Sequence, residues 1–554
     1  MIMGKWTGLL LILVAFSIVG CEDGKVSFKK KKFSQRDVSI TPQNAFTDLF
    51  LDSMQLEQFI TEKKIDSATS QHMRSFYNSR NYQFAWFNQN GLNEPGISFW
   101  NLLNSFILMS KDSSLFDKAL ASRMGQFTDG DTVHNAGKKS LAQTELGLTN
   151  QFFIYARVAY AGRIDPEELK WFIPRKKVNA LALLDSLVKH KGGALEQWEP
   201  LNPQYQALKK ELIRFNEMAD KGGWPTIPEL SGKKTLKPGA KDSIILAVKL
   251  RLLASGDIQQ ADSSIVYDSM LLASIKPVQR RYGFHEDGLI DNALIEALNV
   301  PVKQRIEQIL INMERMRWFP EKPGATRIVA NIPEFKIHVF ENDQEVFDMD
   351  IVVGKEGNST VIFNDELKYI VFSPYWNVPP SIVKNEIMPA MERNPNYLAS
   401  QNMEITNNSG GIPTIRQKPG PKNSLGRVKF LFPNKHAIYF HDTPAKSLFK
   451  REKRALSHGC MRLADAEKMA NYLLRDKPEW TPEKIKSAMH SSEEKWVTLD
   501  NHIPVYVSYS TAWVDQQGHL NFREDIYGHD RKMAEQMFVK PSLPQAEGEA
   551  ITSN

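Results

Sequence analysis

The residues best suited to chemistry in this 554-residue sequence lie in one short stretch, HDTPAKSLFKREKRALSHGCMRL, at positions 441–463. It contains His441, His458 and Cys460, and Cys460 is one of only two cysteines in the chain. A thiol becomes a strong nucleophile once it loses its proton, and a histidine within hydrogen-bond reach can take that proton. The stretch therefore predicts nucleophilic catalysis by Cys460, with His441 or His458 as the base of a thiolate–imidazolium pair.

The residues around Cys460 fit a covalent mechanism. Gly459 allows a tight turn and a close approach of the backbone to a substrate. We expect the N–H groups of Gly459 and Cys460 to face a developing oxyanion, and losing one such donor typically raises the barrier by about 3 kcal/mol. Arg462 supplies a fixed positive charge suited to a substrate carboxylate.

Two other interpretations of these residues stay open. His436, His441, His458 and Cys460 could bind zinc, although the spacing lacks the CxxC or HExxH element that makes a zinc site specific. Cys460 could instead be a buried structural thiol, although its polar neighbours do not form an apolar pocket. We expect the basic residues of 446–454 to form a solvated loop without a part in catalysis.

The N-terminus reads as a secretion signal. A short basic start precedes an apolar run over residues 8–20, which is well short of the ~20 residues that a membrane-spanning helix needs. The run ends in Ile18-Val19-Gly20-Cys21, which resembles a bacterial lipobox, so that residues 1–20 would be removed and Cys21 acylated. An ordinary signal peptide with a chance cysteine is the alternative.

Lipidation of Cys21 would anchor the mature protein to a membrane without spanning it. Cys460 would then be alone in an extracytoplasmic compartment, with no partner for a disulfide, and either inert or kept for chemistry. Residues 21–40 are expected to form a tether, and the lysines of 29–32 in it either touch anionic lipid or are simply solvated.

The bulk composition places the body of the chain among soluble globular proteins. Hydrophobic residues make up 42% and charged residues 24%, and no internal stretch is long and apolar enough to cross a bilayer. The net charge of +6 is mild for this length, and no nucleic-acid recognition motif accompanies it. We therefore expect no nucleic-acid partner.

The patterning predicts a multidomain α+β protein. Residues 41–240 show helical spacing and read as a scaffold, 241–300 as a small three-helix bundle with Asp291 capping its last helix, and 301–325 as a linker helix. Residues 326–530 alternate as strands do, and 531–554 read as a tail. The expected strands are a hairpin over 335–351, followed by 367–372, 437–440, 504–509 and 520–522, with a turn at 515–518 before the last.

An insertion interrupts the expected β domain. Residues 382–393 look helical, while 406–425 are rich in Gly, Pro, Asn and Ser. We expect residues 383–425 to form either a lid over a site or a surface loop.

The helical bundle resembles the peptidoglycan-binding modules of bacterial wall enzymes. The matching residues are Gly256-Asp257, Gln279-Arg280, Gly283, Asp287-Gly288 and Leu298-Asn299. The resemblance implies binding to peptidoglycan, and a purely structural bundle is the alternative.

A more specific resemblance covers nearly all of the mature chain. His441, followed after fifteen residues by Ser457-His458-Gly459-Cys460, resembles the signature of the L,D-transpeptidases, the cysteine enzymes that cross-link bacterial peptidoglycan. The similarity is closest to the large Gram-negative branch, and it is weaker over residues 77–86 and 161–166. Its further segments are Tyr375-Trp376-Asn377-Val378-Pro379, Pro419-Gly420-Pro421, Asn423, Leu425-Gly426, Lys429-Phe430, Phe432-Pro433-Asn434, His441-Asp442-Thr443-Pro444 and Asp525-Ile526-Tyr527.

The resemblance implies a role for each site residue and no metal or cofactor. Cys460 would be the nucleophile and His441 the base, oriented by the backbone carbonyl of Asp442, with His458 as a neighbour in the site. Many smaller members of the family carry Asn where this chain has Arg462, which points to the large branch and leaves the activity intact. The substrate-binding residues would be Arg462, Ser457, Tyr439, Trp376 and Asn377.

The resemblance also implies a reaction and a location. Cys460 would attack the third residue of a tetrapeptide stem and release D-alanine, and the side-chain amine of a second stem would complete a 3→3 cross-link. Carbapenems would acylate Cys460. Partners would be stem peptides and glycan, with wall-synthesis enzymes left open, and the protein would be lipid-anchored in the cell envelope facing the periplasm. An L,D-carboxypeptidase that uses water, and a non-catalytic wall-binding lipoprotein, are the alternatives.

Overall fold

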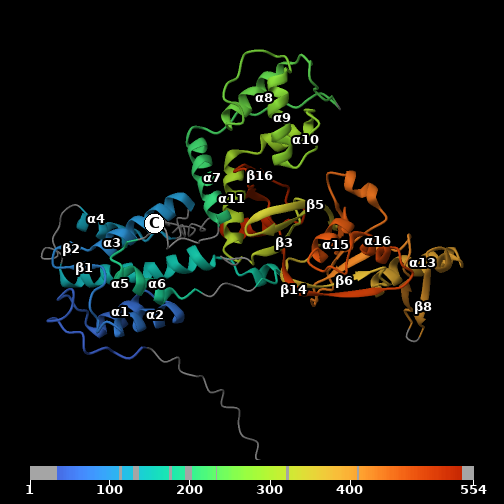
Figure 1. Ribbon diagram of the computed structural model, residues 1–554. Helices are drawn as coiled ribbons and strands as arrows, with labels where there is room; N and C mark the ends of the chain where they lie inside the picture. The colour runs from blue at the N-terminus through green and yellow to red at the C-terminus, as the bar shows by residue number, and fades with distance from the viewer. Residues whose placement is uncertain are drawn as a thin grey trace, which may run out of the picture.

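The fold is taken from a computed structural model, in which the described residues are 34–110, 115–128, 137–173, 178–193, 203–232, 234–319, 324–408 and 411–538. The predicted signal peptide, Cys21, most of the tether and the end of the tail lie outside them. Figure 1 shows a helical N-terminal part on one side, a small bundle above the middle and a β-rich part on the other side. Within the described ranges, no helix has the length and apolar character needed to span a membrane.

The N-terminal part is a helical domain with its own core. Asp52 and Asp66 cap the first two helices by accepting backbone N–H bonds, as expected for side chains at helix N-termini. The domain is held by a buried carboxylate, because Glu145 accepts hydrogen bonds from the backbone N–H groups of Ala85 and Trp86. Its helices are α1 (Ser53–Glu62), α2 (Ser67–Asn78), α3 (Glu94–Ser110), α4 (Lys118–Thr128), α5 (Lys138–Ala156) and α6 (Ala180–Lys189), beside the short strands β1 (Phe87–Asn88) and β2 (Gly91–Leu92).

The small bundle has a separate core and three capped helices. Asp291 accepts a 2.9 Å hydrogen bond from the N–H of Leu294, which confirms its predicted role as a cap. Gly283 ends the middle helix in a left-handed conformation, which glycine adopts without strain. The helices are α8 (Ser243–Ala254), α9 (Ser269–Tyr282) and α10 (Asn292–Asn299).

A long helix joins the parts of the molecule. α11 (Val302–Met316) packs against α7 (Pro203–Asp220) and against α17 (His529–Met537). Arg315 on α11 forms a buried ion pair with Asp530 at 2.6 Å. The prediction that 531–554 is a tail is therefore wrong for its first seven residues, which continue a helix packed on α11.

The β-rich part is built on a sheet that closes on itself. Its hydrogen-bonded order is β12-β5-β13-β11-β10-β6-β14-β3-β4, and β4 also pairs with β5, which closes a ring. The strands are β3 (Thr326–Asn331), β4 (Lys336–Glu341), β5 (Gln344–Gly354), β6 (Phe363–Phe372), β10 (Val428–Leu431), β11 (Phe440–His441), β12 (Ala455–Ser457), β13 (Met461–Leu463) and β14 (Lys495–Ser508). α15 (Ala466–Leu474) and α16 (Pro482–Met489) contribute to the same core.

The expected strands are found, with two corrections. The strand predicted at 437–440 is shorter, because Ala437 has a positive φ of 54° and β11 begins only at Phe440. The strand β16 (Leu520–Phe522) pairs with β15 (Ala512–Val514), so the turn at 515–518 does not connect it directly to residues 504–509. The multidomain α+β class is confirmed, since the helical domain, the bundle and the sheet each have their own hydrophobic core.

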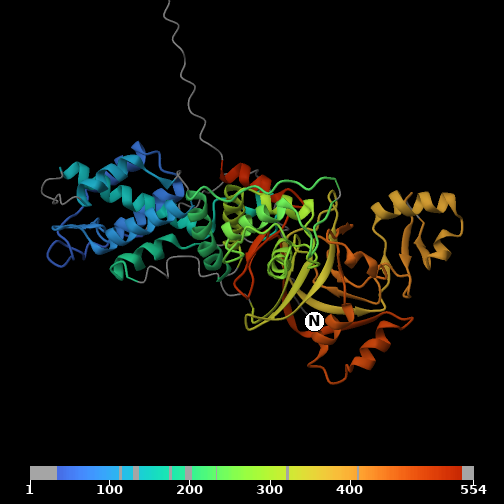
Figure 2. The ribbon, with the colours of Figure 1, turned by 90° about the horizontal axis from the view of Figure 1, so that it is seen from above.

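The insertion between β6 and β10 is a small folded unit over the described residues 373–408 and 411–427, and it is called the lid below. It projects away from the ring, on the side farthest from α1 and α2 (Figures 1 and 2). The predicted helix is present as α12 (Pro380–Ile382), a π-helical turn (Val383–Ile387) and α13 (Met388–Arg393). The Gly- and Pro-rich part contributes a strand to a sheet that the sequence did not predict, formed by β7 (Trp376–Asn377), β9 (Thr414–Gln417) and β8 (Met403–Asn407).

Candidate active site

Two adjacent parallel strands position the predicted catalytic residues. In β11 and β13, Phe440 lies opposite Met461 and His441 lies opposite Arg462. Phe440 and Met461 are fully buried in the core of the ring. Because side chains alternate along a strand, the residues on either side of these two point to the opposite face. That face carries Tyr439, His441, Cys460 and Arg462.

Cys460 is a free, half-buried thiol immediately before β13. Its Sγ lies 3.6 Å from the backbone carbonyl oxygen of Ala437. Burial raises the pKa of Cys460, while hydrogen bonds from the backbone and side chain of Tyr439 and the positive charge of Arg462 act in the opposite direction. The net upward shift favours the protonated thiol, so Cys460 would need a base to become a thiolate.

His441 is suited to be that base. Its side chain is buried, and its Nδ1 lies 2.6 Å from the carbonyl oxygen of Asp442. A carbonyl only accepts hydrogen bonds, so Nδ1 must carry the proton and Nε2 is left unprotonated in the neutral ring. Burial, followed by the positive charge of Arg462, lowers the pKa of His441 to about 4. The ring is therefore neutral at pH 7 and its Nε2 can accept a proton.

His441 and Cys460 occupy diagonal positions on the same sheet face. No hydrogen bond joins them within the described residues. Diagonal neighbours on adjacent strands lie about 7–8 Å apart at Cα, within reach of long side chains. A nucleophile and its base are commonly farther apart without substrate than in the reacting complex.

The side chain of Asp442, the residue that follows His441, is fixed by several contacts. Its carboxylate accepts a 2.9 Å hydrogen bond from the N–H of Arg427 and lies 2.7 Å from Lys446 Nζ. Gly426 packs directly against this carboxylate: a Cβ there would clash with Asp442 Oδ2, and its φ of 64° also favours glycine. The backbone carbonyl that contacts His441 therefore belongs to an anchored residue.

The turn before Cys460 is closed by Ser457. The hydroxyl of Ser457 donates to the carbonyl of Cys460 at 2.7 Å and accepts the N–H of Gly459 at 3.1 Å. The prediction that the Gly459 N–H faces an oxyanion is thus wrong for this structure, because Ser457 already occupies that donor. The N–H of Cys460 has no acceptor among the residues that the structure describes, and it remains the candidate donor.

Thr360 also fixes this turn through hydrogen bonds, and Tyr527 fixes the end of β5 that Thr360 contacts. Thr360 donates its hydroxyl to the carbonyl of Gly459 at 2.7 Å and accepts the N–H of Gly354 at 2.9 Å. The hydroxyl of Tyr527 donates to the carbonyl of Gly354. Sequence reasoning missed Thr360 and Gly354 as site residues, and the only signal for Tyr527 was its place in the resembling segment 525–527.

Comparison with protein families agrees with this geometry. Residues 325–498 match the L,D-transpeptidase catalytic domain, and residues 71–212 match a scaffold domain. This chain carries an L,D-transpeptidase catalytic domain. The family resemblance predicted from the sequence is confirmed for both of these segments.

Several similar proteins are named as L,D-transpeptidases. A candidate L,D-transpeptidase of Haemophilus influenzae is 29% identical over 243 residues, which cover 41% of this chain and 49% of the relative. The chain thus matches about half the length of this curated relative. Among solved structures, an L,D-transpeptidase from Mycobacterium smegmatis is 13% identical, with a TM-score of 0.19, over 33% of this chain and 58% of the other. One from Stackebrandtia nassauensis is 13% identical, with a TM-score of 0.21, over 51% of this chain and 96% of the other.

Arg462 borders the site of this L,D-transpeptidase domain with an unused donor. Its Nε is buried and has no hydrogen-bond partner among the described residues. Burial lowers the pKa of Arg462, and the sulfur of Cys460 acts against this shift. The spare donor beside Cys460 fits its predicted role as a carboxylate-binding residue.

Of the other predicted site residues, one lies beside His441, one contacts the lid, and two belong to the lid. Tyr439 lies in the site, with its ring centroid 5.7 Å from that of His441. His458 points to the lid, where its Nε2 lies 2.8 Å from Glu386 Oε1. Trp376 and Asn377 lie in the lid strand β7, opposite Gln417 and Arg416, and no hydrogen bond or ring contact within the described ranges joins them to Cys460 or His441.

The basic loop 446–454 is more than a solvated loop, which corrects the prediction from sequence. Lys446 joins Asp442 to the end of β13, since its Nζ also lies 2.8 Å from the carbonyl oxygen of Ala464. Arg454 is buried and donates to the carbonyls of Ile351, Arg451 and Phe335. The two ends of the loop are therefore tied to the catalytic sheet.

The zinc alternative finds no supporting arrangement. Among the described residues, no group of three or more His, Cys, Asp and Glu side chains is placed to hold a metal ion. The ring of His436 instead packs against the rings of Phe172 and Phe363, at 4.3 and 5.4 Å between centroids.

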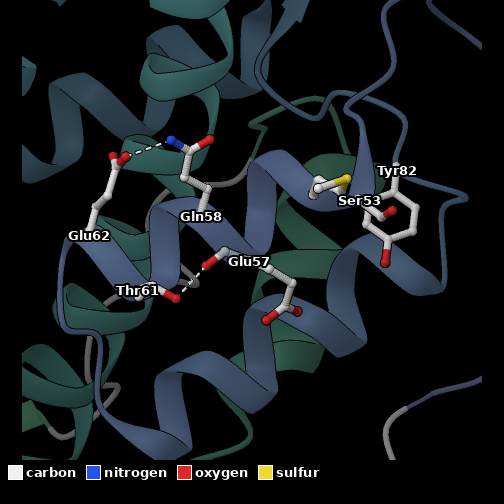
Figure 3. A pocket seen from close by; sticks show the side chains of 7 residues that line it. Ser53, Glu57, Gln58, Thr61, Glu62 and Tyr82 are labelled. Atoms are coloured by element: carbon white, nitrogen blue, oxygen red, sulfur yellow. Dashed lines mark hydrogen bonds between the residues drawn. The ribbon is translucent and has the colours of Figure 1, made fainter.

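A surface hollow lies in the helical domain, away from Cys460 and His441. It has a volume of about 540 Å³ and is formed on α1, with Met54, Glu57 and Tyr82 among its lining residues (Figure 3). Gln58 bonds to Glu62, and the hydroxyl of Thr61 donates to the backbone carbonyl of Glu57, so these polar groups are already paired along the helix. The hollow belongs to the helical domain and not to the catalytic site.

Proposed function

We propose that this protein is a lipid-anchored L,D-transpeptidase that forms 3→3 peptidoglycan cross-links through an acyl-enzyme on Cys460. One observation carries the proposal: a neutral, carbonyl-bound His441 shares a sheet face with a free Cys460 thiol, on the adjacent strand. A thiol and a neutral imidazole arranged in this way support general-base activation of the nucleophile.

The first half-reaction begins with proton transfer from Cys460 to Nε2 of His441. The thiolate attacks the carbonyl carbon of the third stem residue, and a C–S bond forms. The C–N bond to the terminal D-alanine then breaks, and the imidazolium of His441 returns the proton to the leaving amine. The thioester on Cys460 is the acyl-enzyme.

Two groups are suited to stabilise this step. The N–H of Cys460 lacks an acceptor within the described part of the chain and would bind the developing oxyanion. Arg462 would bind a carboxylate of the stem through its spare Nε donor.

The second half-reaction transfers the acyl group to an amine. The side-chain amine of a second stem forms a C–N bond to the thioester carbon and loses a proton to His441, while the C–S bond breaks. Water in place of the amine would give a trimmed tripeptide, which is the carboxypeptidase alternative.

The decisive experiment measures the intact mass of the purified protein after incubation with a carbapenem. The wild type should gain the mass of one carbapenem, and Cys460→Ala should gain none. A wild type without an adduct would contradict the cysteine mechanism and favour the non-catalytic wall-binding alternative.

The products then separate the two enzymatic alternatives. Muropeptides from cells that express the wild type, compared with Cys460→Ala, should contain 3→3 dimers that the variant lacks. Tripeptides without 3→3 dimers would instead assign the chain as a carboxypeptidase.

Location and wall attachment complete the proposal. Acylation of Cys21 would anchor the protein in the envelope facing the periplasm, and the α8–α10 bundle would bind peptidoglycan. Cys21→Ser should then move the protein from the membrane fraction to the soluble fraction, and loss of sedimentation with purified peptidoglycan on removal of the bundle would support its binding role.

A further inference from the structure

The lid and the catalytic turn meet through one pair of side chains. Glu386 lies in the π-helical turn Val383–Ile387 of the lid, and its Oε1 is 2.8 Å from Nε2 of His458. His458 stands two residues before Cys460, so their Cα atoms are at most about 7 Å apart. The carboxylate of Glu386 therefore contacts the turn that carries Cys460.

The backbone on both sides of this contact is fixed. Val383 and Ile387 are buried in the small core of the lid, which holds the turn that presents Glu386. Ser457 and Thr360 hold the turn that presents His458. π-helical turns are rare and frequently occur at functional sites.

The contact itself is weak and incomplete. Side-chain exposure is 54% for Glu386 and 41% for His458, and ion pairs this exposed contribute about 0–1 kcal/mol. The second carboxylate oxygen of Glu386 has no partner among the described residues. A cationic ligand can therefore bind this carboxylate or replace His458 at small energetic expense.

We propose that Glu386 is the acceptor-binding residue of this enzyme, which captures the positively charged amine of the incoming stem at the entrance to Cys460. This inference rests on the proposed function, since it requires an acyl-enzyme that waits for an amine. A carboxylate at the entrance raises the local concentration of ammonium groups but not of water. Glu386 thus favours transpeptidation over hydrolysis of the same thioester.

The chemical step is unchanged by this capture. The bound ammonium loses one proton to solvent as it leaves the carboxylate for the thioester. The neutral amine then forms the C–N bond and passes its second proton to His441, while the C–S bond breaks and the thiolate of Cys460 is restored.

The test measures how the acyl-enzyme divides between a cross-linked dimer and a hydrolysed tripeptide. A disaccharide tetrapeptide serves as donor, and a disaccharide tripeptide with a free side-chain amine serves as acceptor, because it lacks the residue that a donor must lose. Cross-linked dimer and hydrolysed tripeptide are measured against acceptor concentration for the wild type, Glu386→Gln, His458→Gln and Glu392→Gln. Glu392 is an exposed lid residue on α13 and is the matched control.

Glu386→Gln should raise the acceptor concentration for half-maximal cross-linking about tenfold, as expected for loss of a charge-assisted hydrogen bond. Glu392→Gln should match the wild type. His458→Gln should not raise that concentration, because it frees the carboxylate for the amine. Equal defects in Glu386→Gln and His458→Gln would overturn the proposal in favour of a simple lid closure.

Carbapenem adduct formation separates this inference from the proposed function. A wild type that forms the carbapenem adduct but only hydrolyses its acyl-enzyme overturns acceptor capture and leaves cysteine acyl transfer intact. Adduct formation in Glu386→Gln confirms that its nucleophile is functional, so that a lost dimer reports on the acceptor. Absence of the adduct in the wild type overturns both proposals.

Discussion

His441 and Arg462 lie directly opposite each other on the parallel strands β11 and β13. The guanidinium of Arg462 disfavours a positive charge on the imidazole and, after burial, is the largest cause of the lowered pKa of His441. The same cation favours the negatively charged form of Cys460. One residue thereby keeps the proposed base neutral and the proposed nucleophile easier to ionise.

Replacing Arg462 should shift the pH dependence of acylation. In the wild type, the rate should rise as pH increases through about 4, where the imidazolium of His441 loses its proton. In Arg462→Met, the imidazolium is no longer disfavoured by a neighbouring cation, so the pKa of His441 rises and the acid limb moves to higher pH. The measurement is the rate of carbapenem adduct formation against pH. Arg462→Lys keeps the charge and should keep the limb near its original position, and identical profiles in all three proteins would contradict this assignment.

Lys446 should support catalysis from outside the site. Its ammonium connects the carboxylate of Asp442 to the carbonyl of Ala464, and Asp442 in turn supplies the carbonyl that holds His441. Its side chain is half exposed, so its effect should be modest. Lys446→Met should reduce the acylation rate about threefold to tenfold with little change in the thermal unfolding midpoint. Lys446→Arg should recover part of the rate, and full activity of Lys446→Met would show that Asp442 holds its position without it.

The local pattern of the sequence was enough to predict the principal elements and to single out the candidate reactive residues. The hairpin over 335–351 and the helix near 382–393 follow from spacing within one segment, and both are present. Cys460 and His441 stand out by residue type and by the motif that contains them. Such features depend on residues close in sequence, which a pattern can report.

The parts that the sequence did not predict depend on contacts between distant segments. Thr360 reaches Gly459 across 99 positions, and Tyr527 reaches Gly354 across 173. The engagement of the Gly459 N–H by Ser457 needs the actual turn geometry, because both residues are compatible with an open oxyanion hole. The lid sheet was hidden because its strands are short and lie in a segment rich in turn-forming residues.

Ser457 should be needed for the shape of the catalytic turn. Its hydroxyl satisfies both the carbonyl of Cys460 and the N–H of Gly459, and Gly459 has a φ of 119° that only glycine adopts readily. Ser457→Ala leaves both backbone groups without this partner, and each unsatisfied buried group raises the free energy by about 1–3 kcal/mol. We expect the acylation rate to fall about tenfold or more, measured by adduct formation at pH 7. Ser457→Thr retains the hydroxyl and should be less affected, and an unchanged rate in Ser457→Ala would show that the turn holds without it.

A buried ion pair in the catalytic sheet should give a defined pH window of stability. His338 on β4 lies 3.0 Å from Glu334 and 3.2 Å from Glu345. Against the effect of burial, Glu334 and then Glu345 raise the pKa of His338 to about 10, and His338 lowers the pKa of Glu334 to about 2. For the raised histidine, stability is complete below its unfolded pKa of about 6.5 and is lost as pH rises towards 10. For the lowered carboxyl, stability is complete above about pH 4.3 and is lost as pH falls towards 2.

The His338–Glu334 pair should therefore contribute most to the free energy of unfolding between about pH 4.5 and 6.5. Glu334→Gln removes one of the two carboxylates beside the buried His338, while Glu345 stays 3.2 Å from its Nδ1, and should lower the free energy of unfolding by about 2 kcal/mol in that window. Denaturant titrations at pH 6 and pH 9 compare the variant with the wild type, and the difference should be smaller at pH 9, where His338 in the wild type has begun to lose its favourable linkage. Glu356→Gln, at an exposed site in the turn after β5, is the control and should show no such trend. A difference between Glu334→Gln and the wild type that is the same at both pH values would indicate that His338 is neutral in the folded protein.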